Sequence, residues 1–252
     1  MNTTTINKRS GWSCAAIDHI DFALLELKPA TGFSEQAYSS LINREGLDRC
    51  GYREAFPQLL FDVTSTNPAS SAWSLAPAVC YHAFISLANS RLAVPQRITA
   101  RGRCFRNEEY IIPDRRQIEF EMREFILIGH EHWIESQLEA WQATLLKFAA
   151  QIGIDAQWQS ASDPFFLPLS KGRALIQRLL NTKIELCLSD GLAIASINRH
   201  RSHFTDKLSI VVDQAENGAP NGELKTRPAT HSACIAFGLD RWAWAERTAN
   251  RK

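Results

Sequence analysis

Arg106 and Glu108 form a charged pair whose spacing suits nucleotide binding. Residues 97–109, RITARGRCFRNEE, mix apolar and polar positions as a β-strand does. Side chains two apart on a strand point to the same side, so a guanidinium and a carboxylate would lie together. The arginine could neutralise an α-phosphate, and the glutamate could accept a hydrogen bond from an adenine amino group. A plain surface salt bridge has the same spacing, so the pair alone does not decide between these readings.

Arg241 is a distant cation that could act on the same ligand. Residues 231–246, HSACIAFGLDRWAWAE, predict a strand that runs into a helix across Gly238. This places Arg241 at the start of the helix, after a glycine that permits close packing.

The clearest strand signal lies between these two arginines. Ile118, Phe120 and Met122 alternate with charged residues, which predicts an antiparallel strand with one buried and one solvated face. The turn IIPDRR, residues 111–116, would join it to the preceding strand as a hairpin.

The remaining elements complete an antiparallel arrangement. Apolar residues recur every three or four positions over 131–150, which predicts an amphipathic helix. Many strands with few crossover helices predict an α+β fold, an antiparallel sheet flanked by helices. We further expect helices at 34–46 and 171–182, a turn leading into an extended segment at 51–64, strands at 183–188, 192–198 and 207–212, and a polar loop at 214–228.

Composition indicates an ordinary globular protein. Of 252 residues, 45% are hydrophobic and 22% are charged, and no Gly/Ser-rich or Pro-rich linker divides the chain, so we expect one domain over residues 1–252. No apolar run is long enough for a membrane helix, and the N-terminus has no apolar core typical of a signal peptide. We therefore expect a cytoplasmic protein.

Charge and cysteine content limit the possible partners. The net charge of +1, without a basic stripe, disfavours a broad polyanion interface and makes tRNA an unexpected partner. The 6 cysteines are scattered, which favours free thiols or metal ligands over a disulfide framework.

Three segments resemble, in order, the signature motifs of class II aminoacyl-tRNA synthetases, most closely the seryl type. They are GYREAFP, CFRNEE with its hairpin and EFEMREF, and GLDR. The resemblance implies the catalytic fold of that class and a homodimer whose interface is built by the first motif, ending at Pro57. It also implies that Arg106 and Arg241 act on ATP catalytically, while Glu108 and Phe120 hold the adenine.

A narrower resemblance covers roughly residues 50–245. The segments LAPAVCYHAF, FEMREF, DPFF, ASINRHRSHF and HSACIAFGLDRW are similar to the amino acid:[carrier protein] ligases. These are truncated relatives of the atypical, zinc-dependent seryl-tRNA synthetases that lack a tRNA-binding domain. The resemblance implies ATP-dependent activation of a small amino acid as an aminoacyl-adenylate. It also implies transfer to the phosphopantetheine thiol of a carrier protein.

The same resemblance implies that Cys80, Glu124 and Cys234 bind Zn²⁺. Two thiolates and a carboxylate would leave a fourth tetrahedral position for the free amino group of the substrate. Without the resemblance, a cysteine in an apolar run such as PAVCY is typically a small buried hydrophobe. The other four cysteines match nothing in the family and read as structural thiols.

Residues around the substrate are implied less sharply. Ser196 and Asn198 match substrate-lining positions, whereas HFT at 203–205 replaces the family's HFG, which questions a preference for glycine or alanine. His200 and His203 are either part of this pocket or ordinary strand-end histidines. Glu185 is the candidate carboxylate for Mg²⁺.

We expect a helical insertion at about 131–182, in which residues 167–182 lie where the family has its helical docking element for the carrier protein. Lys171, Arg173 and Arg178 would suit an acidic partner, and a solvated helix face would explain them equally. Three alternatives remain open. The adenylate could be passed to tRNA or to a small amine, or the chain could be a non-catalytic paralogue that binds or regulates.

Overall fold

A seven-stranded sheet is the centre of the fold, with the strand order β1-β6-β7-β12-β10-β9-β8 in the described residues. The computed structural model describes residues 14–67, 72–161, 182–213 and 229–249. Strand β1 is parallel to β6, and the other neighbours pair antiparallel. The strands are β1 (Ser34–Glu35), β6 (Gln96–Phe105), β7 (Glu119–Gly129), β8 (Ala156–Ser160), β9 (Lys183–Leu188), β10 (Ala193–Arg201) and β12 (His231–Gly238).

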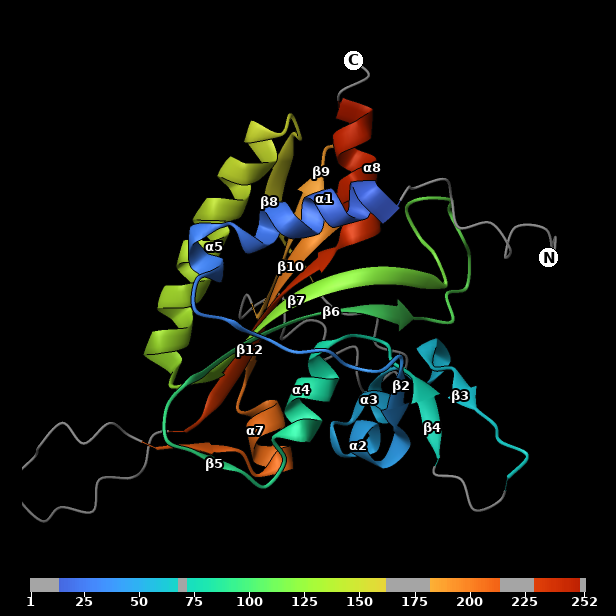
Figure 1. Cartoon of the computed structure of the whole chain (residues 1–252), viewed down its shortest axis with the longest axis vertical. Helices are drawn as coiled ribbons and strands as arrows, with labels where there is room; N and C mark the ends of the chain where they lie inside the picture. The colour runs from blue at the N-terminus through green and yellow to red at the C-terminus, as the bar shows by residue number, and fades with distance from the viewer. Residues whose placement is uncertain (1–13, 68–71, 162–181, 214–228, 250–252) are drawn as a thin grey trace, which may run out of the picture.

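Helices cover both faces of this sheet (Figure 1). One face packs against α1 (Cys14–Leu25), α5 (Glu131–Gln151) and α8 (Leu239–Ala249). The other packs against α4 (Cys80–Ser86) and α7 (His203–Leu208). Beside these lie α2 (Arg44–Arg49), α3 (Tyr52–Ala55), the sheet of β2 (Leu41–Asn43), β3 (Asp62–Val63) and β4 (Trp73–Leu75), and the pair β5 (Arg91–Leu92) and β11 (Val211–Val212). The 3-10 turns η2 (Lys28–Ala30) and η3 (Pro57–Leu59) complete the elements. The α+β prediction is confirmed.

Strand β7 is buried on both faces, which corrects the prediction of a half-solvated strand. From Glu121 to Gly129 every residue is buried. Phe125 and Leu127 join the core beneath α1, α5 and α8, whereas Ile126 and Ile128 join the core beneath α4 and α7. The alternation predicted at 118–123 forms a strand from Glu119 onward, but Arg123 on its charged side is covered by α1 and β1.

Arg123 is a buried charge on that side, and α1 neutralises it. Its side chain is 2% exposed, and its Nε and Nη2 donate to the two carboxylate oxygens of Asp21, both at 2.7 Å. Its Nη1 also donates to Glu35 of β1 at 2.8 Å. A buried guanidinium needs such partners because desolvation of an unpaired charge is costly.

We expect Asp21→Ala to destabilise the protein by about 3–5 kcal/mol, because it leaves a buried arginine without its bidentate partner. The free energy of unfolding in urea measures this. Glu35→Ala provides the control, since this carboxylate is 59% exposed and its loss should cost about 1 kcal/mol or less. Equal losses for the two variants would show that burial does not decide the strength of these pairs.

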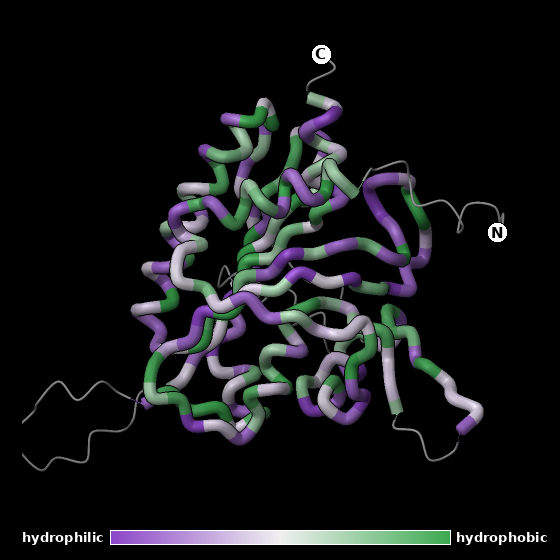
Figure 2. Tube along the Cα trace, viewed as in Figure 1, coloured by the Kyte–Doolittle hydropathy of each residue, from purple (hydrophilic) through white to green (hydrophobic). Residues whose placement is uncertain are grey.

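The predicted helix over 131–150 is confirmed as α5. Leu138, Trp141 and Leu145 are fully buried, and the opposite side faces solvent. Figure 2 shows this amphipathic character as alternating purple and green along the helix. The hairpin is confirmed too, since β6 and β7 pair in register from Gln96↔Ile128 to Phe105↔Glu119.

The predicted helix at 34–46 is wrong. Ser34 and Glu35 pair with β6, and the helix α2 begins only at Arg44. The reason is a local cap: the Asn43 side chain accepts a hydrogen bond from the Gly46 amide, which starts the helix there. Segment 51–64 also forms the short helix α3 before it becomes extended.

The predicted strand at 207–212 is also largely wrong. Residues 203–208 form α7, which buries Phe204 and Leu208 one turn apart. Ser209 then adopts a left-handed conformation with φ of 54°, and only Val211 and Val212 form a strand, outside the central sheet. The strands expected at 183–188 and 192–198 are confirmed as β9 and β10.

Within the predicted insertion, 131–182, the described residues hold α5 and also strand β8 at the sheet edge. The predicted helix at 171–182, the DPFF segment, the three basic residues and the loop at 214–228 lie outside the described residues. The single-domain boundary therefore stays a prediction. Among the described helices, none combines the length and apolar character needed to cross a bilayer.

Candidate active site

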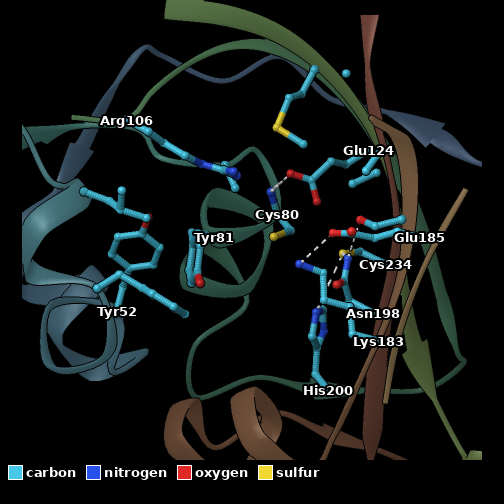
Figure 3. A pocket seen from close by; sticks show the side chains of 18 of the residues that line it. Tyr52, Cys80, Tyr81, Arg106, Glu124, Lys183, Glu185, Asn198, His200 and Cys234 are labelled. Atoms are coloured by element: carbon cyan, nitrogen blue, oxygen red, sulfur yellow. Dashed lines mark hydrogen bonds and ion pairs between the residues drawn. The ribbon is translucent and has the colours of Figure 1, made fainter. Parts of the chain in front are cut away.

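Every residue that the sequence predicted for the site lines one cavity of about 740 Å³. The cavity lies against the α4 and α7 face of the central sheet, and Figure 3 shows its side chains converging from several elements. The predicted residues on its wall are Cys80, Arg106, Glu108, Phe120, Glu124, Ser196, Asn198, Cys234 and Arg241. Cys80 and Arg241, which are 161 positions apart in the sequence, therefore line the same cavity.

Strand register explains how the sheet contributes. Glu124 of β7 lies opposite Ala236 of β12, and Ala236 lies opposite Ser196 of β10. Ser196 in turn lies opposite Glu185 of β9. Because side chains alternate between faces, residues two positions along each strand share this surface, which adds Cys234.

The predicted metal-binding trio is brought together. The ligand atoms of Cys80, Glu124 and Cys234 all lie within 4.8 Å of one another, and the three residues are buried. Cys80 opens helix α4, so a helix and two adjacent strands contribute one ligand atom each.

Helix α4 fixes the carboxylate of this trio. Glu124 Oε1 accepts hydrogen bonds from the backbone amides of Val79 at 2.8 Å and Cys80 at 3.3 Å. These amides belong to the first turn of α4, where free N–H groups and the helix dipole favour a negative charge. The backbone of α4 thereby holds a buried carboxylate.

The protonation of the two thiols reflects this crowding. Hydrogen bonding to Cys234, burial and the charge of Glu124 raise the pKa of Cys80 well above its usual value. The hydrogen bond from Cys80 lowers the pKa of Cys234, but burial and Glu124 outweigh it, so the pKa of Cys234 is raised as well. A coordinated divalent cation reverses this balance, because thiols that bind it are deprotonated.

Arg106 reaches the cavity from a loop rather than a strand, which corrects the expected geometry. Strand β6 ends at Phe105, and Glu108 N donates to Arg106 O at 2.8 Å in a tight turn. The guanidinium lies 5.1 Å above the centroid of the Phe120 ring, and its Nε donates to Pro77 O at 3.0 Å. Arg106 and Glu108 nevertheless line the same cavity, because the turn brings both side chains to it.

Glu108 forms an ion pair that the sequence reading did not name. Arg116 Nη1 donates to Glu108 Oε2 at 2.7 Å, and Arg116 also lies over the ring of Tyr110. Both interactions connect the two ends of the loop between β6 and β7. One carboxylate oxygen of Glu108 is thus already engaged by Arg116.

Arg241 is aimed by two backbone carbonyls. Its Nε donates to Arg115 O and its Nη1 to Ala193 O, both at 2.8 Å. Burial, followed by the charges of Arg106 and Arg116, lowers the pKa of Arg241 to about 10. The Arg241 guanidinium is therefore still protonated at neutral pH. The positive charges of Arg106, Arg116 and Arg241 lie close together and would favour the binding of an anion.

Lys183 and Glu185 complete the sheet side of the cavity. Their ion pair spans 3.1 Å, and Figure 3 places both beside Asn198 and Cys234. Lys183 was missed by sequence reasoning, although its position two residues before Glu185 on a predicted strand is a usable signal. Tyr52 and Tyr81, which line the opposite wall, carried no comparable pattern.

The departure from HFG at Thr205 has a structural explanation. Thr205, the residue that departs from HFG, is 2% exposed and donates through its hydroxyl to Thr230 O at 2.5 Å. It ties α7 to the chain before β12 and is absent from the cavity wall. Pro57 opens the 3-10 turn η3, and its place at the end of the first motif stays a prediction.

Two curated proteins of Bradyrhizobium diazoefficiens are similar over most of this chain. Amino acid–[acyl-carrier-protein] ligase 1 is 30% identical over 255 residues, covering 88% of this chain and 73% of that protein. Amino acid–[acyl-carrier-protein] ligase 2 is 32% identical over 238 residues, covering 82% and 67%. No protein-family model matches the chain.

Solved structures show where the fold belongs. SerRS of M. kandleri, solved with A. aeolicus tRNASec, superposes with a TM-score of 0.74 at 17% identity over 95% of this chain. The cytoplasmic serine-tRNA ligase of Naegleria fowleri in complex with AMP, at 12% identity, gives a TM-score of 0.66 over 92% of it. The prolyl-tRNA synthetase of Giardia lamblia in complex with prolyl-adenylate, at 14% identity, gives 0.67, also over 92%. The chain spans about half of these proteins, namely 53%, 47% and 44% of their lengths.

These likenesses confirm the fold as a class II aminoacyl-tRNA synthetase catalytic domain, in agreement with the sheet order and the hairpin. The identity and coverage of the two curated relatives go further. This chain belongs to the amino acid–[acyl-carrier-protein] ligase family.

Proposed function

We propose that this protein uses ATP to activate a small amino acid and passes it to the phosphopantetheine thiol of an acyl-carrier protein. The observation that carries the proposal is the junction of two clusters in one cavity: the arginines Arg106 and Arg241, and the Cys80, Glu124 and Cys234 trio. The two arginines suit the binding of a polyphosphate. The trio suits a metal ion that would bind the amino group of the substrate. The names of the two curated relatives support the same activity.

The trio has the donor chemistry of a zinc site. Two sulfurs and one carboxylate oxygen within 4.8 Å of one another are typical zinc ligands, and they leave one position of a tetrahedral ion open. We propose that Cys80, Glu124 and Cys234 hold Zn²⁺. When bound, the ion would supply a Lewis-acid position that accepts a neutral α-amine, which distinguishes amino acids from other carboxylic acids.

In the first step, the carboxylate of the amino acid attacks the α-phosphorus of ATP, and the bond to pyrophosphate breaks. The protein's contribution is to position the reactants and to neutralise the phosphates. Arg106 lies beside Phe120, so a purine that stacks on this ring would bring its α-phosphate near the guanidinium. Arg241 is held by two backbone carbonyls, and its remaining N–H groups would contact the β- and γ-phosphates of ATP, which leave as pyrophosphate.

In the second step, the carrier thiol attacks the carbonyl carbon of the adenylate, forming a thioester and releasing AMP. The thiol proton leaves with the departing phosphate, so no protein nucleophile is needed. We propose a carrier protein rather than tRNA as the acceptor, because the relatives bear that name and the net charge is only +1.

Three further features belong to the proposal. Glu185, which is paired with Lys183 and lies opposite Ser196, is the proposed carboxylate for the Mg²⁺ that accompanies ATP. A homodimer is implied by the class II fold, and light scattering tests it. All 6 cysteines are free thiols, which supports a reducing cytoplasmic location that cell fractionation would check.

The test is amino-acid-dependent exchange of pyrophosphate into ATP, run across all twenty proteinogenic amino acids, with and without a zinc chelator. We expect exchange with one or a few small amino acids, and loss of that exchange on chelation. A folded, zinc-loaded protein that supports no exchange with any of them would contradict the proposal. Thioester formation on a phosphopantetheinylated carrier protein then tests the acceptor, with uncharged tRNA as the comparison.

A further inference from the structure

Two side chains of strand β10 approach the sulfur of Cys234 from the same side. Asn198 Nδ2 lies 3.4 Å from Cys234 Sγ, and His200 Nε2 lies 3.6 Å from it. Both distances are within the range of hydrogen bonds to sulfur. Figure 3 shows the two side chains side by side at this ligand. The resemblance to known ligases had suggested only that Asn198 lines the substrate pocket.

An irregularity in β10 directs the second of these side chains. Asn198 pairs with Cys234 and Arg199 with Ala233, but the next pair is Arg201 with Ser232, so His200 is an inserted residue. Bulges of this kind occur often beside active sites, where they re-aim a side chain. The inserted His200 lies next to β12 with its Nε2 at 3.6 Å from the Cys234 sulfur.

The geometry allows both nitrogens to donate to Cys234: Asn198 Nδ2 donates to the sulfur, and His200 Nε2 can donate to it in one tautomer. A metal-bound sulfur would carry no proton, so both nitrogens would have to donate to it. His200 Nδ1 would then be an acceptor, and the buried Ser232 hydroxyl lies 3.4 Å from it. Donation to the sulfur also fixes the Asn198 amide, whose nitrogen contacts both Cys234 Sγ and Ser196 Oγ. Its oxygen is then turned away from the sulfur.

His200 contacts the sulfur of Cys234 and not the position between Cys80, Glu124 and Cys234 where a metal ion would lie. It is not part of the described group whose ligand atoms all lie within 4.8 Å of one another. Its ring is also held from the other side, by Phe84 at 5.5 Å and Phe204 at 4.7 Å between centroids. The aromatic pair fixes the ring plane, and the bulge fixes its position.

We propose that Asn198 and His200 are positioning residues that donate paired hydrogen bonds to the Cys234 sulfur and so fix this metal ligand. Groups that hydrogen-bond a metal ligand orient it and tune its donation, and their loss typically weakens metal binding about 10- to 100-fold. This inference rests on the proposed zinc site but adds residues outside the trio.

The test measures zinc affinity by competition with a chromophoric chelator, and the thiolate-to-metal charge-transfer band of the Co²⁺-substituted protein. His200→Phe keeps the aromatic packing and removes the donor, and Asn198→Leu removes the other. We expect each to weaken zinc binding about 10-fold or more. The charge-transfer band should move to longer wavelength, since a sulfur that loses hydrogen bonds is easier to oxidise.

His200→Gln is the rescue, because its amide nitrogen can replace Nε2, and it should restore most of the affinity and the band position. His203→Phe is the matched control: this histidine also lines the cavity, but its Nε2 lies 3.2 Å from Cys50 O. It should leave both readouts unchanged. Thermal unfolding of the metal-free variants separates binding from folding.

The outcomes separate this inference from the proposed function. Zinc affinity and cobalt band equal to wild type in both donor-less variants would overturn the positioning role and leave the zinc site standing. Equal losses in His200→Phe and His200→Gln would overturn the hydrogen-bond explanation. A wild-type protein that binds neither Zn²⁺ nor Co²⁺ would overturn both the site and this inference.

Discussion

Arg241→Ala should lower the rate of amino-acid-dependent pyrophosphate exchange by at least about 100-fold, a typical cost for removing a preorganised charge-stabilising group. The two carbonyl contacts hold this guanidinium in the cavity before any ligand arrives, so it contributes without reorganisation. Because Arg241 lies outside the trio, zinc content should remain at the wild-type level. The exchange assay and metal analysis on one preparation measure both quantities.

Arg103→Ala is the matched control for this variant. Arg103 is an arginine of β6 that is 56% exposed and pairs only at the surface with Glu119. Its loss should change exchange by less than about twofold, as is usual for exposed ion pairs. Wild-type exchange in Arg241→Ala would remove this arginine from the catalytic machinery and weaken the assignment of the third motif.

Cys80→Ser and Cys234→Ser should each reduce bound zinc severely and abolish exchange. Each change replaces one of the three proposed protein ligands with a hydroxyl that is a far poorer donor for zinc at neutral pH. Metal analysis of dialysed protein gives the first readout, and the exchange assay gives the second. Helix α4 should stay folded in both variants, because Glu124 still holds its first turn.

Cys187→Ser is the control for these changes. Cys187 is also a buried free thiol, but it lies on β9 outside the trio. Its replacement should leave zinc at the wild-type level. Undiminished zinc in Cys80→Ser and Cys234→Ser would eliminate the metal site, whatever the exchange assay showed.

The residues predicted for the site line one cavity, whereas several of the elements predicted around it were wrong. The resemblance could propose Cys80, Glu124 and Cys234 as metal ligands without a fold, because these residue types can themselves bind a metal. Periodicity predicted α5 and the hairpin because each has a long, regular apolar pattern. Short elements such as α2 and α7 lack such a pattern, and their boundaries depend on caps and on packing between distant segments.

Burial on both faces of β7 is the clearest example of what sequence alone could not give. Arg123 looks like a solvated residue until Asp21, 102 positions earlier, is found to cover it. The loop position of Arg106 is similar, since the end of β6 is set by pairing rather than by composition. His200 was left undecided because a bulge has no reliable signature in one sequence.

The carboxylate of Glu124 serves the helix and the proposed metal at once, and this makes the three ligands unequal in evolution. A descendant that lost either cysteine would forfeit the metal yet keep α4 docked through the amides of Val79 and Cys80. A descendant that lost the glutamate would forfeit both, and a buried helix end would be left without an acceptor. Selection for a folded protein therefore protects Glu124 even after catalysis is abandoned.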